Sequence, residues 1–153
     1  MTDSDIGWSI HLHLIYAIAW IGGAVFMFVL GIFMRDKTAQ KEVYPRIGPL
    51  LGYYQVVALA LLLATGISMI SQNGLLTLLI SGSTNEIVLT LQKKLLLVGF
   101  VIVLTIIHFI IAYKTNGKDR TFLQNFISRG SSLLIFFINL WILHYAIIIR
   151  HYL

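Results

Sequence analysis

Residues 95–113 read LLLVGFVIVLTIIHFIIAY and contain no Asp, Glu, Lys or Arg. A helix that crosses the hydrocarbon core of a bilayer needs about 20 apolar residues. Three further stretches also lack all four charged residue types, at 6–34, 47–85 and 130–149. The sequence therefore predicts an all-α, polytopic membrane protein with a bundle of four transmembrane helices. We expect one domain over residues 1–153, with the helices at about 8–34, 48–71, 92–113 and 131–149.

The amino-acid composition also indicates a protein that is surrounded by lipid. Of the 153 residues, 58% are hydrophobic and only 11% are charged, with a mean hydropathy of +0.88. Soluble domains carry about 25% charged residues, so a water-soluble monomer is excluded. The chain has no cysteine, which excludes disulfides, iron–sulfur clusters and thiolate zinc sites. No solvated basic surface accompanies the net charge of +5, so we expect no nucleic-acid partner.

Lysine and arginine are distributed unequally between the two sides of the predicted bundle. Segments 35–47 and 114–130 hold eight of them, whereas the opposite side holds three. Basic residues accumulate on the cytoplasmic side, so both termini are expected on the outer, periplasmic side of an inner or plasma membrane. The eight are Arg35, Lys37, Lys41, Arg46, Lys114, Lys118, Arg120 and Arg129, and the three are Lys93, Lys94 and Arg150.

The outer connection at about 72–91 contains an apolar segment, residues 75–80, that is too short to span a bilayer. We expect this segment to lie in the interface or to dip back into the protein. Ser83, followed three positions later by Glu86, fits a capping box. This motif predicts that the third long helix begins about two turns above the membrane.

Imidazoles inside a membrane are costly and are therefore candidate functional groups. His13 shares a helical face with Trp20 and with the small residues Ala24 and Gly31, so we expect this face toward the bundle. His11 lies on the other side of the same helix and is expected to cap or to reach the interface.

His13 and His144 are predicted at nearly the same depth, because each lies about five residues from the outer end of its helix. Two imidazoles at one level suit axial ligation of the iron of haem b, or the start of a copper site. His108 is expected roughly 14 Å deeper in the membrane. The ordinary alternative is that each histidine hydrogen-bonds a neighbouring helix.

Lys94 shares a helical face with His108 and is a candidate for binding the carboxylates of an anionic ligand such as a porphyrin. A lysine at the start of a transmembrane helix is more often an interface anchor. No hydrolase motif is present, so catalytic residues stay unassigned. The candidate cofactor-binding residues are His13, His144, His108, Trp20 and Lys94, with His13 and His144 as the metal ligands.

The spacing of these residues resembles two related families. His13 is followed seven positions later by Trp20 and then by Ile21-Gly22-Gly23, which resembles the first helix of the copper-resistance-D (CopD)-like membrane domains. Lys94 leading into Leu104-Thr105-Ile106-Ile107-His108 is similar to the third helix of the HemJ-type protoporphyrinogen oxidases. The resemblance implies a small four-helix membrane protein in which these two histidines, Trp20 and Lys94 are the prominent residues.

The two families imply different functions. HemJ-like proteins bind haem b and oxidise protoporphyrinogen IX, whereas CopD-like domains are linked to copper movement across the inner membrane. The HemJ pattern has a His-to-Trp spacing of six, where this chain has seven, and its Pro-Arg pair is replaced by Met34-Arg35. His144 belongs to neither pattern.

Three functions therefore stay open. The first, which we favour, is a protein that binds haem b and acts in membrane redox chemistry or haem synthesis, with oxidoreductase activity if it is HemJ-like. The second is copper transport or handling by His13, His11 and nearby methionines. The third is a non-catalytic accessory subunit of a larger, respiratory-type membrane complex. Lipid is the expected surrounding partner, and a homo-oligomer through the small residues of the first helix is a further alternative.

Overall fold

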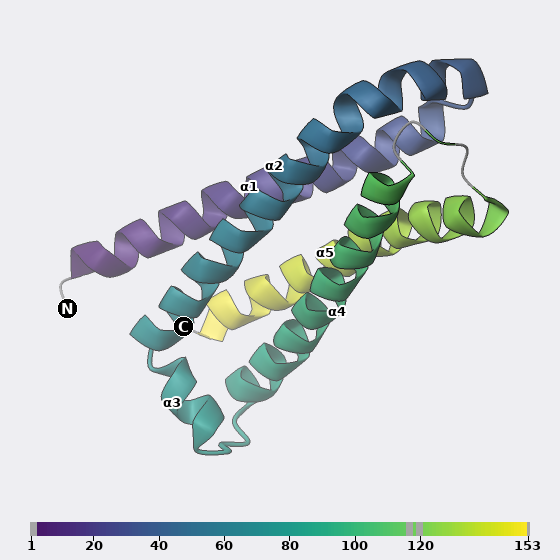
Figure 1. Cartoon of the computed structure of the whole chain (residues 1–153). Coiled ribbons are helices and arrows are strands. Elements are labelled where there is room, and N and C mark those ends of the chain that lie inside the picture. The colour runs from purple at the N-terminus through teal and green to yellow at the C-terminus, as the bar shows by residue number, and fades with distance from the viewer. Residues whose placement is uncertain (1–2, 116–117, 119–120, 153) are drawn as a thin grey trace.

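The structure is a computed structural model that describes residues 3–115, 118 and 121–152, and almost all of them are helical (Figure 1). No strand occurs among the described residues, which confirms the all-α prediction. Four helices are long and apolar enough to cross a membrane. The helices are α1 (Asp3–Phe33), α2 (Lys37–Gln72), the short α3 (Leu75–Ile80), α4 (Glu86–Lys114) and α5 (Phe122–Tyr152).

All four long helices begin before the positions that hydropathy alone predicts. The largest difference is in α2, which begins eleven residues before the predicted position 48. Asp36 caps this helix, because its side chain accepts a hydrogen bond from the backbone N–H of Thr38. Pro45 and Pro49 lie inside α2 and do not end it. Hydropathy reports where a helix enters lipid, whereas the cap determines where the helix begins.

The bundle consists of two antiparallel hairpins. α1 packs mainly on α2, and α4 packs mainly on α5. The hairpins meet through a smaller contact between α1 and α5, while α2 touches α4 at few positions. The α1–α2 and α4–α5 connections lie together at one end, and both termini lie toward the end that carries α3 (Figure 1). Of the eight basic residues assigned to the first end, Arg120 lies outside the described residues.

The connection between α2 and α4 partly differs from its prediction. α3 is flanked by Gly74 and Gly82, whose φ angles of 70° and 69° favour glycine. Leu75 is buried against Leu91 of α4 and Ile149 of α5, so this apolar segment does pack on the protein. The capping box is wrong: the N-cap of α4 is Asn85, and its side chain makes no capping hydrogen bond.

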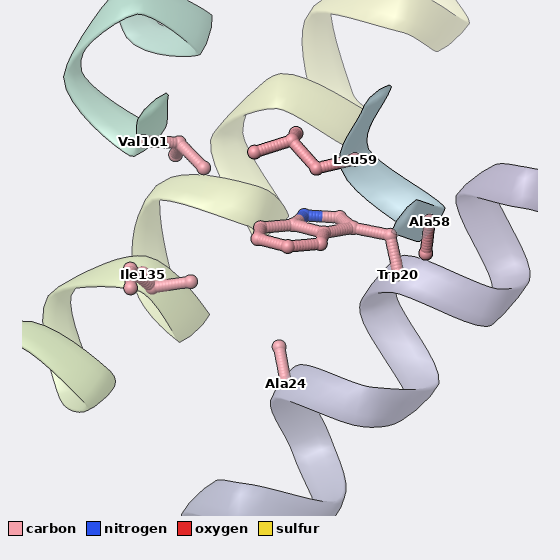
Figure 2. Close-up of a cluster of buried hydrophobic side chains, with 6 residues drawn as sticks. All are labelled: Trp20, Ala24, Ala58, Leu59, Val101 and Ile135. Carbon is pink, nitrogen blue, oxygen red and sulfur yellow. The ribbon is translucent and has the colours of Figure 1, made fainter. Parts of the chain in front are cut away.

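The main core forms where the two hairpins cross. The indole of Trp20 lies among short and branched side chains contributed by all four long helices (Figure 2). Small residues beside the indole let the helices approach closely, which is how membrane helices gain packing contacts. The cluster consists of Trp20 and Ala24 of α1, Ala58 and Leu59 of α2, Val101 of α4 and Ile135 of α5.

Candidate functional site

His13 lies half-buried on α1 and contacts α2. Its Nδ1 is 3.0 Å from Oγ1 of Thr65. The Thr65 hydroxyl donates in turn to the carbonyls of Leu61 and Leu62, at 2.9 and 3.0 Å. In the tautomer with Nδ1–H, the imidazole donates to the Thr65 oxygen, whose own proton goes to one of these carbonyls. A neutral His13 ring in this tautomer keeps its lone pair at Nε2.

Two further residues complete what we call the His13 site, defined as His13, Thr65, Gly66 and Lys94. Gly66 follows Thr65 on α2, and a Cβ atom there would lie 3.2 Å from Cε1 of His13. Lys94 of α4 is half-buried and near enough to His13 for the two groups to interact electrostatically. Thr65 and Gly66 of α2 thus lie against the His13 imidazole, and the Lys94 ammonium of α4 acts on it electrostatically.

The face of α1 expected toward the bundle is buried over most of its length. Trp20 and Ala24 are buried, and His13 is half-buried beside α2. Gly31, near the end of the helix, is exposed instead. His11 is exposed, and its Nδ1 is 2.6 Å from the carbonyl of Gly7, as expected for a residue on the other side.

His108 forms a second cross-helix pair nearer the opposite end of the bundle. Its Nδ1 is 3.2 Å from Oγ of Ser131 on α5, and that hydroxyl donates to the carbonyl of Ser128 at 3.0 Å. Both serines are buried. Lys94 and His108 share a helix but are fourteen residues apart, which is about 21 Å. The lysine therefore belongs with His13 and not with His108.

His144 lies on the exposed side of α5. Its ring contacts Trp141 and Tyr145, with centroid separations of 6.0 and 5.9 Å. With Leu140 and Trp141 it lines an open surface hollow of about 320 Å³. Asn139 faces α1, and His144 is five positions further on, about 140° around the helix. The structure does not bring His144 to His13, which contacts Thr65 and Gly66 of α2.

Trp20 is held by a residue that the sequence did not single out as a site residue. Its Nε1 donates a 3.0 Å hydrogen bond to Oδ1 of Asn139. The Nδ2 atom of Asn139 is buried without a hydrogen-bond partner among the described residues. The sequence does distinguish Asn139, because it is the single side-chain amide in the apolar stretch 130–149 and polar side chains inside a membrane are costly.

Residues that could bind a metal do not cluster in the part of the chain that the structure describes. Within residues 3–115, 118 and 121–152, no group of three or more His, Cys, Asp or Glu residues could hold a metal ion. His11 and His13 lie on different sides of α1, so they do not form a pair.

Comparison with protein-family models, with curated proteins and with solved structures finds no match to this chain. The function of this chain is therefore inferred from the geometry of the His13 site.

Proposed function

We propose that this chain is a multi-pass membrane protein that binds haem b through His13 and acts in membrane redox chemistry or haem synthesis. The observation that carries the proposal is the hydrogen bond from His13 Nδ1 to Thr65 Oγ1. A histidine that ligates a metal usually donates its other ring N–H to a protein acceptor, which orients the ring. The lone pair at Nε2 is the one that haem iron takes from a proximal histidine.

Lys94 supports the same ligand class. Haem b carries two propionate carboxylates, and the half-buried ammonium of Lys94 would attract them, because a partly buried charge is screened less by water than an exposed one. Gly66 leaves the Cε1 edge of the ring uncrowded. The donor set therefore fits one protein ligand to the iron and one cation for a carboxylate. This donor set does not identify a catalytic residue.

A second axial ligand is not supplied at this site by the other two candidate histidines. His108 is paired with Ser131, and His144 lies on the exposed side of α5. When bound, haem would supply one-electron chemistry, while His13 and Lys94 would hold and orient it.

We also propose an orientation with both termini outside, in an inner or plasma membrane. It rests on the eight Lys and Arg residues of segments 35–47 and 114–130, against three in the rest of the sequence.

The test is an absorption spectrum of the protein purified in mild detergent, before and after dithionite. We expect a Soret band and, on reduction, an α band. His13→Ala should remove or shift both bands, whereas His11→Ala, on the other side of the same helix, should leave them unchanged. A flat spectrum from folded protein, or an unchanged one from His13→Ala, contradicts the proposal. Metal analysis of the same sample tests the copper alternative.

The second candidate function is that of a non-catalytic subunit of a larger membrane complex. The observation that favours it is that His13 and His108 each pair with a hydroxyl on a neighbouring helix, as residues that only hold helices together would do. It predicts a flat spectrum, no bound metal, and stable co-purification with other membrane proteins.

A further inference from the structure

The turn between α1 and α2 contains an open hollow of about 340 Å³. Its walls are mainly apolar, and Phe33 is 80% exposed. The charged residues that line it, Arg35 and Asp36, follow the end of α1. The residues that line the hollow are Leu30, Phe33, Met34, Arg35, Asp36 and Ala39.

Two side-chain hydrogen bonds link residues of this turn to the end of α1. Arg35 Nε donates to the carbonyl of Ile32 at 3.3 Å, which fixes the guanidinium beside the hollow. The side chain of Gln40 donates to the carbonyl of Met34 and ties the first turn of α2 to the end of α1. The Nη atoms of Arg35 carry the remaining donors of the planar fork, whose geometry suits phosphate oxygens.

The segment at the hollow, residues 35–47, carries four basic and two acidic residues. Arg35 lines the hollow together with Asp36, and Lys37, two positions after Arg35, is exposed at the start of α2. Of the two nearby acids, Asp36 accepts the capping hydrogen bond of α2, and Glu42 lies 3.7 Å from Arg46. Asp36 keeps its negative charge in this cap and offsets part of the positive charge at the hollow, whereas Glu42 is paired with Arg46. With four basic and two acidic residues, the segment keeps a net positive charge.

The position of the hollow relative to a bilayer follows from the charge-free stretch of α1, residues 6–34. The first charged side chains come directly after this stretch, so its last residues lie where α1 leaves the hydrocarbon core. The apolar walls formed by Leu30, Phe33 and Met34 then face the ends of acyl chains, while Arg35 and Lys37 lie at headgroup level.

We propose that this hollow binds an anionic phospholipid, with an acyl chain against Leu30, Phe33 and Met34 and the phosphate at Arg35 and Lys37. The apolar walls favour a lipid over free phosphate, and the two cations favour an anionic headgroup over a zwitterionic one.

The experiment reconstitutes the purified chain in nanodiscs of mixed phosphatidylglycerol and phosphatidylcholine and counts retained lipids by native mass spectrometry. We expect the wild type to retain phosphatidylglycerol in preference to phosphatidylcholine. Arg35→Gln with Lys37→Gln should lower the affinity on the order of tenfold. Arg35→Lys with Lys37→Arg keeps both charges and should retain most of the binding.

The matched control is Lys93→Gln with Arg150→Gln, which removes two exposed charges at the other end of the bundle. It should retain phosphatidylglycerol like the wild type. Six basic residues remain at the first end in the Arg35/Lys37 variant, so its orientation is preserved. Equal retention of the two lipids by the wild type, equal losses in the variant and the control, or displacement of the lipid by inorganic phosphate would each overturn the proposal.

Discussion

The indole nitrogen of Trp20 donates a 3.0 Å hydrogen bond to the side-chain oxygen of Asn139, and both residues are buried. The two residues are 119 positions apart in the chain. Since α1 and α5 form the principal contact between the hairpins, this bond joins the two halves of the bundle at its core.

The first prediction concerns this bond. Trp20→Phe removes the indole N–H and leaves the buried Asn139 oxygen without its donor, so we expect a loss of about 1–2 kcal/mol in the free energy of unfolding. Asn139→Leu should cost less in a Trp20→Phe background than in the wild type, with a coupling of about 1 kcal/mol. Unfolding in mixed detergent micelles measures this double-mutant cycle, which consists of the wild type, the two single variants and the double variant.

Trp141→Phe is the control for that cycle, because Trp141 is exposed on α5. It should change the stability little. Additive effects of the Trp20 and Asn139 substitutions would show that the bond contributes nothing to the contact between the hairpins.

The second prediction uses neighbouring glycines of α1. A Cβ atom on Gly23 would overlap the side chain of Gln55 and lie 3.0 Å from the ring of Tyr54, both on α2, whereas a Cβ atom on Gly22 would have nothing within 4 Å. Gly23→Ala should therefore destabilise the protein by about 1–3 kcal/mol through overpacking, and Gly22→Ala should not. Adding Gln55→Ala should restore part of the loss. Thermal unfolding in detergent measures the difference, and equal behaviour of the two alanine variants would contradict the packing of α1 on α2.

The third prediction concerns the geometry of the His13 site. Gly66→Ala brings a methyl group to 3.2 Å from His13 Cε1, so the imidazole must move by a few tenths of an ångström. If haem is bound there, its Soret band should shift without being lost. Gly48→Ala on the same helix meets nothing within 4 Å and should leave the spectrum unchanged. A bound haem that is insensitive to Gly66→Ala would be bound away from His13.

The fourth prediction concerns orientation. The chain has no cysteine, so single substitutions can be labelled without background. Thr84 and Lys118 are both exposed, at opposite ends of the bundle. Thr84→Cys should react with an impermeant maleimide in intact cells, while Lys118→Cys should react only after lysis. The reverse pattern would contradict the proposed orientation, and labelling of both in intact cells would contradict four spans.

The sequence predicted the helices better than it predicted the site. Hydropathy identified four long helices, but it missed the start of α2 because a cap and not hydropathy determines that position. For the site, helical phase correctly put His13 on the inward side of α1. It did not show that Lys94 of α4 acts electrostatically on His13, because phase relates residues on one helix and not on two.

The sequence alone determined that the chain is helical and membrane-bound, since the bilayer requires each spanning segment to satisfy its own backbone hydrogen bonds and to be apolar along its length. Both requirements are local and can be read from about 20 residues at a time. Only the tertiary structure decided that His13 meets Thr65, that His108 meets Ser131, and that Trp20 meets Asn139. Those pairings depend on how each helix is rotated and which neighbour it packs on, and the fit of small and large side chains between helices determines both.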